Sequence, residues 1–382
     1  MTSISRYLFL LPALALLGCM AAGQTFSVTE IQEPEMVFSK AQDGAKKRIP
    51  AVAVTPRGAF LAATEQRPST SDASLTGIYI ARKEGNGPWA YDRTTLRCDA
   101  GGWGKFMNPS FTVDALGAHG PAGRIYLFFL ATTTRSGLAR DASVAEIATC
   151  YIYSDDDGVS WSDIARVPES AWNQQSFDWM VPSPANGIQV PDGTLFIPCM
   201  GRRSGHWCSG LLFKRPGEDW AYSASSEVME DNESICYEGP DGAVYLNCRN
   251  ETEGHHRPLY RFVPSGGLLE RVDNPFDPNL VCQGTICRVS YEGRDFFLMS
   301  FCDPTAYKKR NRISIWVSPD ALHWIPAIRL TGTTPSAGYS AVDYRNGTCA
   351  AVWEHDSSIE TIGFCDLTPH LPRLLHLAAE RR

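Results

Sequence analysis

The stretch Tyr-Ser-Asp-Asp-Asp-Gly-Val-Ser-Trp, residues 153–161, has the form Ser-x-Asp-x-Gly-x-x-Trp and decides the fold. It follows an apolar run and combines residues that favour a tight turn between two strands. Asp156 can accept hydrogen bonds from backbone amides, Gly158 can adopt a positive φ, and Trp161 can pack beneath the turn. The stretch therefore predicts a strand, a turn and an aromatic anchor.

This pattern is the Asp-box of β-propeller proteins, and weaker copies of it recur at irregular spacing. The weaker copies are residues 81–89, 213–220 and 317–324. Short apolar runs separated by turns, with Pro-Asp-Gly turns at 191–193 and 240–242, fill most of the remaining chain. Only residues 371–377 have a helical pattern. We therefore predict an all-β fold of the propeller type. Six blades would take roughly 60 residues each, more than compact propeller repeats use, so the excess would lie in loops that carry the functional site.

Length and composition agree with this prediction. The chain has 382 residues, of which 43% are hydrophobic, enough to bury a large core. It contains 32 glycines and 25 prolines, which favour many strands and turns. Its net charge of −7 argues against a general nucleic-acid surface.

The N-terminus has the pattern of an export signal. Arg6 precedes an apolar run, residues 7–17, that is too short for a comfortable membrane span. We expect residues 1–23 to be the signal and residues 24–382 to be the propeller. The sequence before Cys19 resembles a bacterial lipobox, which would leave a lipid on Cys19; the alternative is cleavage after Gly23. The chain is expected to be exported, as a periplasmic, outer-membrane lipid-anchored or secreted protein.

Twelve cysteines in an exported chain are compatible with disulfides or with buried free thiols. Cys282 with Cys302, and Cys349 with Cys365, each flank a turn and are the two candidate pairs. No Cys-x-x-Cys or Cys/His metal spacing occurs, so neither a metal nor a cofactor is predicted.

A β-hairpin is predicted in the segment from residue 232 to residue 249. Residues 234–237 form one strand, 239–242 the turn and 243–246 the return strand. Glu233 enters the hairpin and Arg249 leaves it, so the two side chains should be neighbours. Taken alone, the pair could be an ordinary cross-strand ion pair.

Further motifs follow one another in a fixed order. They are Arg48-Ile49-Pro50, Asp72, Gly187-Ile188-Gln189, Glu233 with Arg249, Arg310, Gly338-Tyr339-Ser340 and Glu354. Their order and spacing, with the Asp-box between them, resemble the exo-α-sialidases, a family of six-bladed propellers. The resemblance covers the chain from about Arg48 to Glu354. Departures are that only one Asp-box is intact, and that Leu322-His323-Trp324 replaces the end of another.

The resemblance implies three arginines for the carboxylate of a terminal sialic acid: Arg48, Arg249 and Arg310. Arginine stays charged and binds carboxylate oxygens in a bidentate manner, which suits this task. Arg312 competes with Arg310 for the third place. Glu354 would hold Arg48.

The resemblance also implies the catalytic groups. Tyr339 would be the nucleophile, Glu233 the base that takes its proton, and Asp72 the acid and base for the leaving group and water. Arg67 would line the pocket near Asp72 or be a surface arginine. Three further residues would form an apolar wall or belong to the core: Phe106, Met107 and Trp179.

The function that follows is an exo-α-sialidase acting with retention on sialylated glycans of glycoproteins, glycolipids and oligosaccharides. Two alternatives stay open. One is a trans-sialidase or a related nonulosonic-acid glycosidase, and the other is a non-catalytic glycan-binding propeller.

Overall fold

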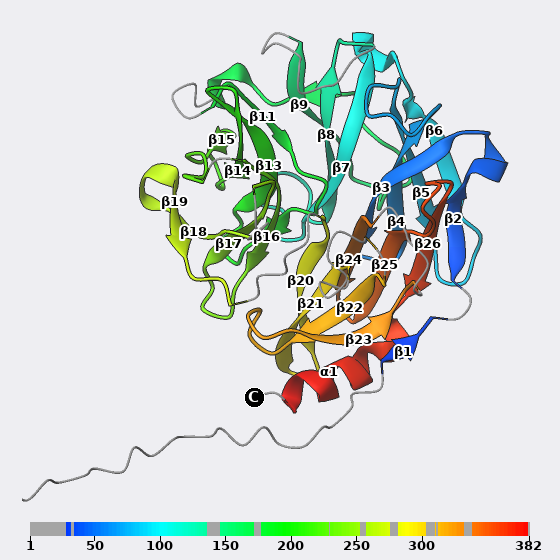
Figure 1. The fold of residues 1–382 in the computed structure, drawn as a ribbon, viewed down its shortest axis with the longest axis vertical. Helices are drawn as coiled ribbons and strands as arrows, with labels where there is room; N and C mark the ends of the chain where they lie inside the picture. Colours follow the sequence, from blue (N-terminus) through cyan, green and yellow to red (C-terminus); the bar gives the residue numbers. More distant parts are fainter. Residues whose placement is uncertain are drawn as a thin grey trace, which may run out of the picture.

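Six β-sheets are arranged around a central axis in the computed structural model, and this confirms the predicted six-bladed propeller (Figure 1). The structure describes residues 28–31, 34–135, 146–171, 177–228, 230–252, 257–275, 282–302, 310, 312–331 and 338–380. The predicted signal in residues 1–23, with Cys19, lies outside these residues.

The first three blades follow one another along the chain. Blade 1 contains β3 (Lys46–Val54), β4 (Phe60–Arg67), β5 (Gly77–Lys83) and β6 (Ala90–Leu96). Blade 2 contains β7 (Lys105–Asp114), β8 (Arg124–Thr132), β9 (Ile147–Ser154) and β10 (Ala165–Arg166). Blade 3 contains β11 (Trp179–Pro182), β12 (Ile188–Gln189), β13 (Leu195–Arg203), β14 (His206–Lys214) and β15 (Ala221–Tyr222).

The other three blades complete the ring. Blade 4 contains β16 (Asp231–Glu238), β17 (Val244–Asn250), β18 (Leu259–Val263) and β19 (Leu268–Val272). Blade 5 contains β20 (Thr285–Tyr291), β21 (Arg294–Phe301), β22 (Ser314–Ser318), β23 (Ile325–Arg329) and β1 (Thr29–Glu30). Blade 6 contains β24 (Ser340–Arg345), β25 (Thr348–Glu354), β26 (Thr361–Asp366) and β2 (Glu35–Ser39).

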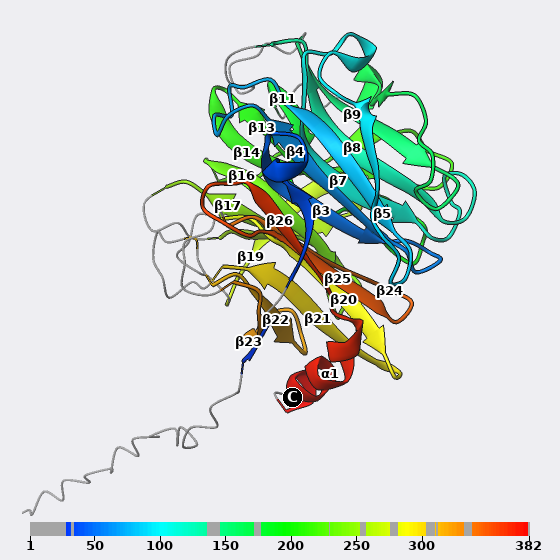
Figure 2. The same cartoon turned by 90° about the vertical axis from the view of Figure 1, so that its right-hand side faces the viewer.

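The N-terminal strands close the ring. The strand β2 pairs with β26, so a segment from the start of the chain completes the last blade. The strand β1 adds to blade 5 in parallel with β23. The helix α1 (Leu371–Ala379) confirms the predicted C-terminal helix and packs against β21 and β22 (Figure 2). No helix within the described part of the chain is long and apolar enough to cross a membrane.

Short 3₁₀ helices occupy several connections. They are Lys40–Gln42, Ala100–Gly102, Glu169–Ala171, Ser265–Gly267 and Thr368–His370.

The turn after β9 has the predicted form. Gly158 has a φ of 84°, and Asp156 accepts a hydrogen bond from the backbone N–H of Ser160 at 2.8 Å. Trp161 packs beside Phe111, with ring centroids 6.4 Å apart.

The first strand of each blade lies nearest the axis. The strand β3 contacts β7 and β24, and β20 contacts β16 and β24. Residues at the N-terminal ends of these strands line one pocket, and residues at their C-terminal ends line a second pocket. The N-terminal ends of the inner strands therefore lie together at one opening of the ring, which we call the mouth.

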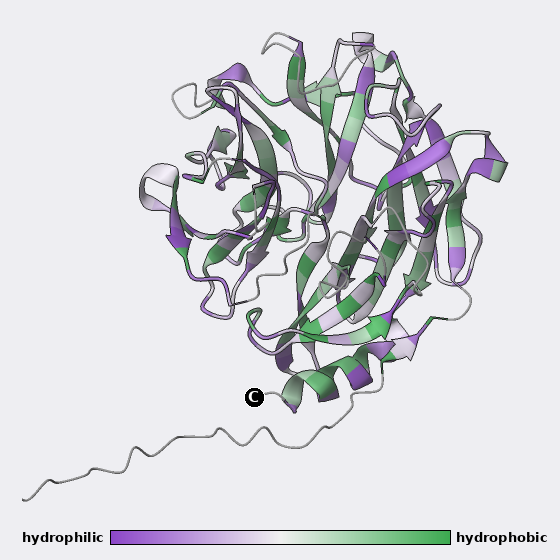
Figure 3. Cartoon of the chain, in the orientation of Figure 1, coloured by the Kyte–Doolittle hydropathy of each residue, from purple (hydrophilic) through white to green (hydrophobic). Residues whose placement is uncertain are grey.

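Buried apolar side chains from neighbouring blades form shared core clusters. Hydrophobic residues lie mainly along the strands, and several turns and strand ends are hydrophilic (Figure 3). All eleven described cysteines are free thiols, and most are buried. The two predicted disulfide candidates are therefore wrong for this structure, and the alternative of buried thiols holds. Cys282 and Cys302 do lie together, with Sγ atoms 3.7 Å apart and no bond between them.

We predict that Gly363→Ala will lower the free energy of unfolding by about 1–3 kcal/mol, because overpacking a filled core forces neighbours to shift. An added Cβ would lie 2.6 Å from Cε2 of the fully buried Trp353, which pairs with Gly363 across β25 and β26. Denaturant unfolding measures the change. In a Trp353→Phe background the same substitution should cost less, because the clashing ring is absent. An equal cost in both backgrounds would contradict this explanation.

Candidate active site

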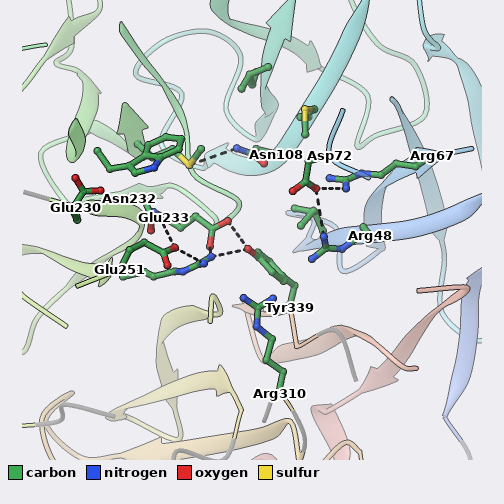
Figure 4. Close-up of a pocket in the computed structure, with 16 residues that line it drawn as sticks. Arg48, Arg67, Asp72, Asn108, Glu230, Asn232, Glu233, Glu251, Arg310 and Tyr339 are labelled. Atoms are coloured by element: carbon green, nitrogen blue, oxygen red, sulfur yellow. Dashed lines mark hydrogen bonds and ion pairs between the residues drawn. The ribbon is translucent and has the colours of Figure 1, made fainter. Parts of the chain in front are cut away.

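A pocket of about 540 Å³ opens at the mouth where the inner strands begin (Figure 4). Charged and polar side chains dominate one part of its lining and apolar side chains another. It is lined by Arg48, Ile49, Arg67, Asp72, Met107, Asn108, Leu130, Met200, Trp207, Glu230, Asn232, Glu233, Arg249, Glu251, Arg310 and Tyr339. Seven of the eight predicted site residues therefore share one pocket, and the eighth, Glu354, lies directly behind it.

Glu354 ends β25 and is fully buried. Its Oε1 accepts hydrogen bonds from Nε of Arg48 at 3.0 Å and from the backbone N–H of Ile49 at 3.1 Å. Its Oε2 accepts a hydrogen bond from the backbone N–H of Tyr339 at 3.0 Å. One carboxylate therefore fixes a cationic side chain from blade 1 relative to Tyr339 at the start of blade 6.

A β-bulge aims Arg48 into the pocket. The pairing of β3 with β4 shifts register between Arg48 and Ala51. Ile49, inside the bulge, has a φ of 52°, an uncommon conformation for a β-branched residue. Because a bulge adds a residue to one strand, it changes the direction of the neighbouring side chain.

Tyr339, Glu233 and Arg249 form a closed set of contacts. The hydroxyl of Tyr339 donates a hydrogen bond to Oε1 of Glu233 at 2.6 Å. Arg249 donates to the hydroxyl oxygen of Tyr339 at 2.9 Å and forms an ion pair with Oε2 of Glu233. The predicted hairpin is confirmed with β16 and β17 as its strands, and its two charged ends are neighbours as expected. A phenol, a proton acceptor and a cation thus meet at one point.

The protonation of Tyr339 follows from these neighbours. Burial raises the pKa of the Tyr339 phenol, and the Glu233 carboxylate raises it further, against three nearby guanidinium groups. Tyr339 is therefore neutral and has a proton acceptor in contact.

Two arginines lie over the ring of Tyr339. The guanidinium carbon of Arg48 is 5.2 Å from the ring centroid, and that of Arg310 is 5.5 Å from it. Arg310 lines the pocket, whereas Arg312 is not among the described lining residues. Arg312 has a φ of 50° and precedes the first residue of β22 by two positions. Of the two candidates, the geometry favours Arg310.

Asp72 and Arg67 occupy the opposite side of the pocket from Glu251 (Figure 4). Arg67 is buried, contrary to the alternative of a surface position, and it forms ion pairs with both Asp72 and the fully buried Glu65. Nη1 of Arg48 lies 3.6 Å from Oδ1 of Asp72. Asp72 itself is 58% exposed, so it faces solvent at the entrance.

The charge state of Asp72 depends on these arginines. Burial raises the pKa of the Asp72 carboxyl, but the guanidinium groups of Arg67 and Arg48 lower it more, so that it lies below its usual range. Asp72 is therefore ionised. An anion that neutralised Arg48 would raise the pKa of Asp72.

The predicted apolar wall is correct only in part. Met107 lines the pocket, together with Leu130, Met200 and Trp207, which the sequence did not indicate. Phe106 and Trp179 are core residues instead. Phe106 packs edge-on against Phe129, and Trp179 packs edge-on behind Trp207. Phe106 and Met107 are adjacent in β7 and so point to opposite faces, which explains why only one reaches the pocket.

Two carboxylates were missed although a simple signal marks each. Glu65 lies two residues before Arg67 in β4, and Glu251 lies two residues after Arg249. Residues two apart in a strand share a face, so each acid is placed beside its arginine. Nη2 of Arg249 donates to Oε1 of Glu251 at 2.5 Å, and Asn232 donates to the same oxygen at 2.8 Å.

Asn108 was also missed, and no sequence signal marks it. Its backbone N–H donates to Oε1 of Glu65 at 2.8 Å, and its φ is 57° at a register shift in β7.

No group of three or more His, Cys, Asp or Glu residues that could bind a metal ion occurs in the described residues.

Comparisons with known proteins identify the family of the chain and proteins of similar fold. Residues 58–350 match the family described as BNR repeat-like domain. The chain is 27% identical over 339 residues to the Exo-alpha-sialidase of Aspergillus fumigatus, with 78% of this chain and 77% of the fungal protein aligned. Among solved structures, it is similar to the Hadza microbial sialidase Hz136, with a TM-score of 0.74 and 21% identity, covering 88% of this chain and 69% of the other.

A second solved structure is the Trypanosoma rangeli sialidase in complex with 2,3-difluorosialic acid, described as a covalent intermediate. The TM-score is 0.69 at 15% identity, covering 87% of this chain. This chain spans 55% of the length of the trypanosomal chain. At these identities the structural likeness supports the fold.

A buried carboxyl beneath the pocket predicts a pH effect on stability. Asp231 is fully buried, and it accepts hydrogen bonds from Asn250 at 2.9 Å and from the hydroxyl of Tyr260 at 3.2 Å. Burial raises the pKa of Asp231 to about 7, whereas an unfolded aspartate titrates near ~3.9. Its protonated form therefore stabilises the fold below the unfolded pKa, and this contribution is lost as the pH rises through about 7.

We predict that Asp231→Asn will reduce the loss of unfolding free energy between pH ~4 and ~7 by a few kcal/mol, because an amide does not ionise. Denaturant unfolding at several pH values measures this. The exposed Asp163→Asn is the matched control and should keep the wild-type pH dependence. The prediction fails if Asp231→Asn and the wild type lose stability in parallel.

Proposed function

The chain belongs to the BNR repeat-like domain family and is a glycoside hydrolase of the sialidase type, and from this premise we propose that it is a retaining exo-α-sialidase. Its substrates would be glycans that end in sialic acid, and Tyr339 would be its nucleophile. The observation that carries the proposal is the contact of the Tyr339 hydroxyl with Glu233 at 2.6 Å, inside a pocket that contains Arg48, Arg249 and Arg310.

The three arginines suit the substrate. A terminal sialic acid carries a carboxylate on its anomeric carbon, and guanidinium groups bind carboxylates with two parallel hydrogen bonds. The guanidinium groups of Arg48 and Arg310 lie over the Tyr339 ring, and Arg249 contacts its hydroxyl. A carboxylate held by these groups would bring the anomeric carbon next to the phenol oxygen.

The same carboxylate explains why the nucleophile is a tyrosine. An aspartate or glutamate at this position would bring two negative charges together at the reacting carbon. A neutral phenol avoids this repulsion, and sialidases are known to use tyrosine in place of the usual second carboxylate. The phenol needs a base, and Glu233 is in position to take its proton.

The first step joins the sugar to the enzyme. Tyr339 attacks the anomeric carbon while its proton passes to Glu233. Asp72 donates a proton to the leaving glycosidic oxygen, and that bond breaks. Nearby arginines lower the pKa of Asp72. The carboxylate of a bound substrate would offset these positive charges, and this favours the protonated form of Asp72 that the step needs.

The second step releases the sugar. Asp72, now ionised, takes a proton from water, and the resulting hydroxide attacks the anomeric carbon. The bond to Tyr339 breaks, and Glu233 returns the proton to the phenol oxygen. Two displacements at the same carbon give net retention. The covalent intermediate described for the trypanosomal sialidase supports this route for the present chain.

Export is a further part of the proposal. It is supported by the apolar run at residues 7–17 and the lipobox-like sequence before Cys19. Sialylated glycans are found on extracellular glycoproteins and glycolipids, so an exported enzyme would meet its substrate.

We predict that Tyr339→Phe will lower kcat/KM for an aryl α-sialoside by at least ~10²-fold, because the variant has no nucleophilic oxygen. Release of the aryl alcohol measures the rate. Tyr245→Phe is the matched control, since its hydroxyl contacts Asp241 on the hairpin turn and should not matter. Incubation with 2,3-difluorosialic acid should add the mass of one glycosyl group to the peptide that contains Tyr339.

Three outcomes would change the assignment. An unchanged rate in Tyr339→Phe, or label on another residue, would remove Tyr339 from its role. Transfer to a lactose acceptor in preference to water would indicate a trans-sialidase. If neither the wild type nor the variant cleaves any α-sialoside or related nonulosonic-acid glycoside, the chain is a glycan-binding propeller.

We predict that Asp72→Asn will affect substrates according to their leaving groups. Hydrolysis of sialyllactose should fall by at least ~10²-fold, because a sugar alkoxide leaves poorly without a proton. Formation of the glycosyl-enzyme from an aryl sialoside with an acidic phenol should fall much less. Burst kinetics with each substrate separate the two steps. Equal losses for both substrates would show that Asp72 does not protonate the leaving group.

A further inference from the structure

Two thiols lie directly behind the proposed nucleophile. Cys282 precedes β20 and Cys302 follows β21, and both side chains are fully buried. Their Sγ atoms are 3.7 Å apart. Each Sγ also contacts the carbonyl oxygen of Gly338, at 3.3 Å from Cys282 and 3.4 Å from Cys302. The residue whose carbonyl they share is the one that precedes Tyr339.

Gly338 is closely packed against Arg310 and Cys282. Gly338 has a φ of 100°, which favours glycine. A Cβ added there would lie 2.8 Å from Cβ and Cδ of Arg310 and 2.9 Å from Sγ of Cys282. A displaced sulfur atom would therefore move Gly338, and with it Tyr339, or would move Arg310.

The two thiols differ in reactivity. The hydrogen bond from Cys302 lowers the pKa of the Cys282 thiol, with the guanidinium groups of Arg310 and Arg249 acting in the same direction. The pKa of Cys302 is raised, and burial raises the pKa of the other cysteines in the described part of the chain. A thiol with enhanced thiolate character next to a second thiol is the arrangement found in oxidisable cysteine pairs.

We propose that Cys282 and Cys302 are a covalent modification site, at which a peroxide closes a disulfide that displaces Tyr339 from Glu233 and lowers the activity. The pair lies outside the set of groups that the glycosidase reaction uses. Its chemical partner is hydrogen peroxide, whose small size is required because both thiols are fully buried.

The oxidation balances in two steps. The Cys282 thiolate attacks one peroxide oxygen, the O–O bond breaks, and the leaving hydroxide takes up a proton as water, which leaves a sulfenic acid on Cys282. The Cys302 thiolate then attacks that sulfur, an S–S bond forms, and the sulfenic oxygen leaves as a second water. The two thiols lose two protons and two electrons in total, and these reduce one hydrogen peroxide to two waters.

Closing the bond must disturb the site. A disulfide has an S–S distance of about 2.05 Å, so the sulfur atoms must approach by more than 1 Å from their present separation of 3.7 Å. The thiol contacts with the Gly338 carbonyl oxygen are lost at the same time, because a disulfide carries no S–H group. Because the Tyr339 hydroxyl depends on a 2.6 Å contact with Glu233, a shift of about 1 Å is expected to lower kcat by at least ~10-fold.

The test begins with the wild-type protein. The reduced full-length protein is treated with hydrogen peroxide, digested without reductant, and mapped by mass spectrometry. A linked peptide pair containing Cys282 and Cys302, two hydrogens lighter than the separate peptides, supports the proposal. Its absence overturns the proposal, and this readout does not depend on the sialidase activity.

The second part of the test uses activity and rests on the proposed function. With an aryl α-sialoside, kcat should fall on oxidation and recover with dithiothreitol. Recovery separates the disulfide from oxidation of Met107 and Met200 in the pocket, since a thiol reductant does not readily reverse methionine sulfoxide. A mapped disulfide with unchanged kcat would overturn the claim that Tyr339 is displaced.

Variants complete the test, each compared with its own untreated activity. Cys282→Ser should keep its kcat after peroxide, because it lacks the attacking thiol. Cys208→Ser, which changes an equally buried cysteine in blade 3, should lose activity as the wild type does. Equal losses in both variants would overturn the assignment. Should Cys282→Ser fail to fold, the peptide map of the wild-type protein still decides.

Discussion

The buried carboxylate of Glu354 is the contact on which the geometry of the site depends. It accepts N–H groups from two residues of blade 1 and from Tyr339 in blade 6. These two blades are the first and last of the ring, so the contact spans the point where the propeller closes. An ionised carboxylate in an apolar core is costly unless it is paired and hydrogen-bonded, and here each oxygen has a partner. The positions of Arg48 and Tyr339 relative to each other therefore depend on the contact between the first and last blades.

The active mouth departs from ideal strand geometry where the functional side chains emerge. Register shifts occur at the starts of β3, β7 and β16, which carry Arg48, Asn108 and Glu233. A regular strand would alternate its side chains between the two neighbouring blades. A bulge turns one residue toward the axis instead, and the positive φ of Ile49 and Asn108 is part of this arrangement. Two strained backbone positions thus lie at the pocket, where the N–H of Ile49 donates to Glu354 and the N–H of Asn108 donates to Glu65.

The sequence predicted the fold and the main polar residues of the site. It did not predict most of the contacts that position those residues. The strand–turn–tryptophan pattern and the hairpin at β16 and β17 depend on local turn chemistry, which is legible in a single sequence. The residues that support the site are distant in the chain: Asn108 contacts Glu65, and Leu130, Met200 and Trp207 come from three strands. Bulges and packing between blades are tertiary effects, so no local pattern marks them. The sequence left Phe106 and Trp179 open between the pocket wall and the core, because composition alone does not distinguish a lining residue from one directly behind it.

The pattern of charges explains how so many arginines are accommodated. Arg48 is held by Glu354, Arg67 by Glu65, and Arg249 by Glu233 and Glu251. Each of these guanidinium groups is thus oriented by a carboxylate before any substrate arrives, and all three arginines line the pocket. Donors that are already oriented need little reorganisation when an anion binds or when charge develops in a transition state, so they stabilise it more than flexible donors would. The ion pairs of Arg48, Arg67 and Arg249 also explain why these three arginines can exist at low exposure. Unpaired arginines so close together would repel one another, whereas the paired set forms a stable surface that is complementary to one additional carboxylate.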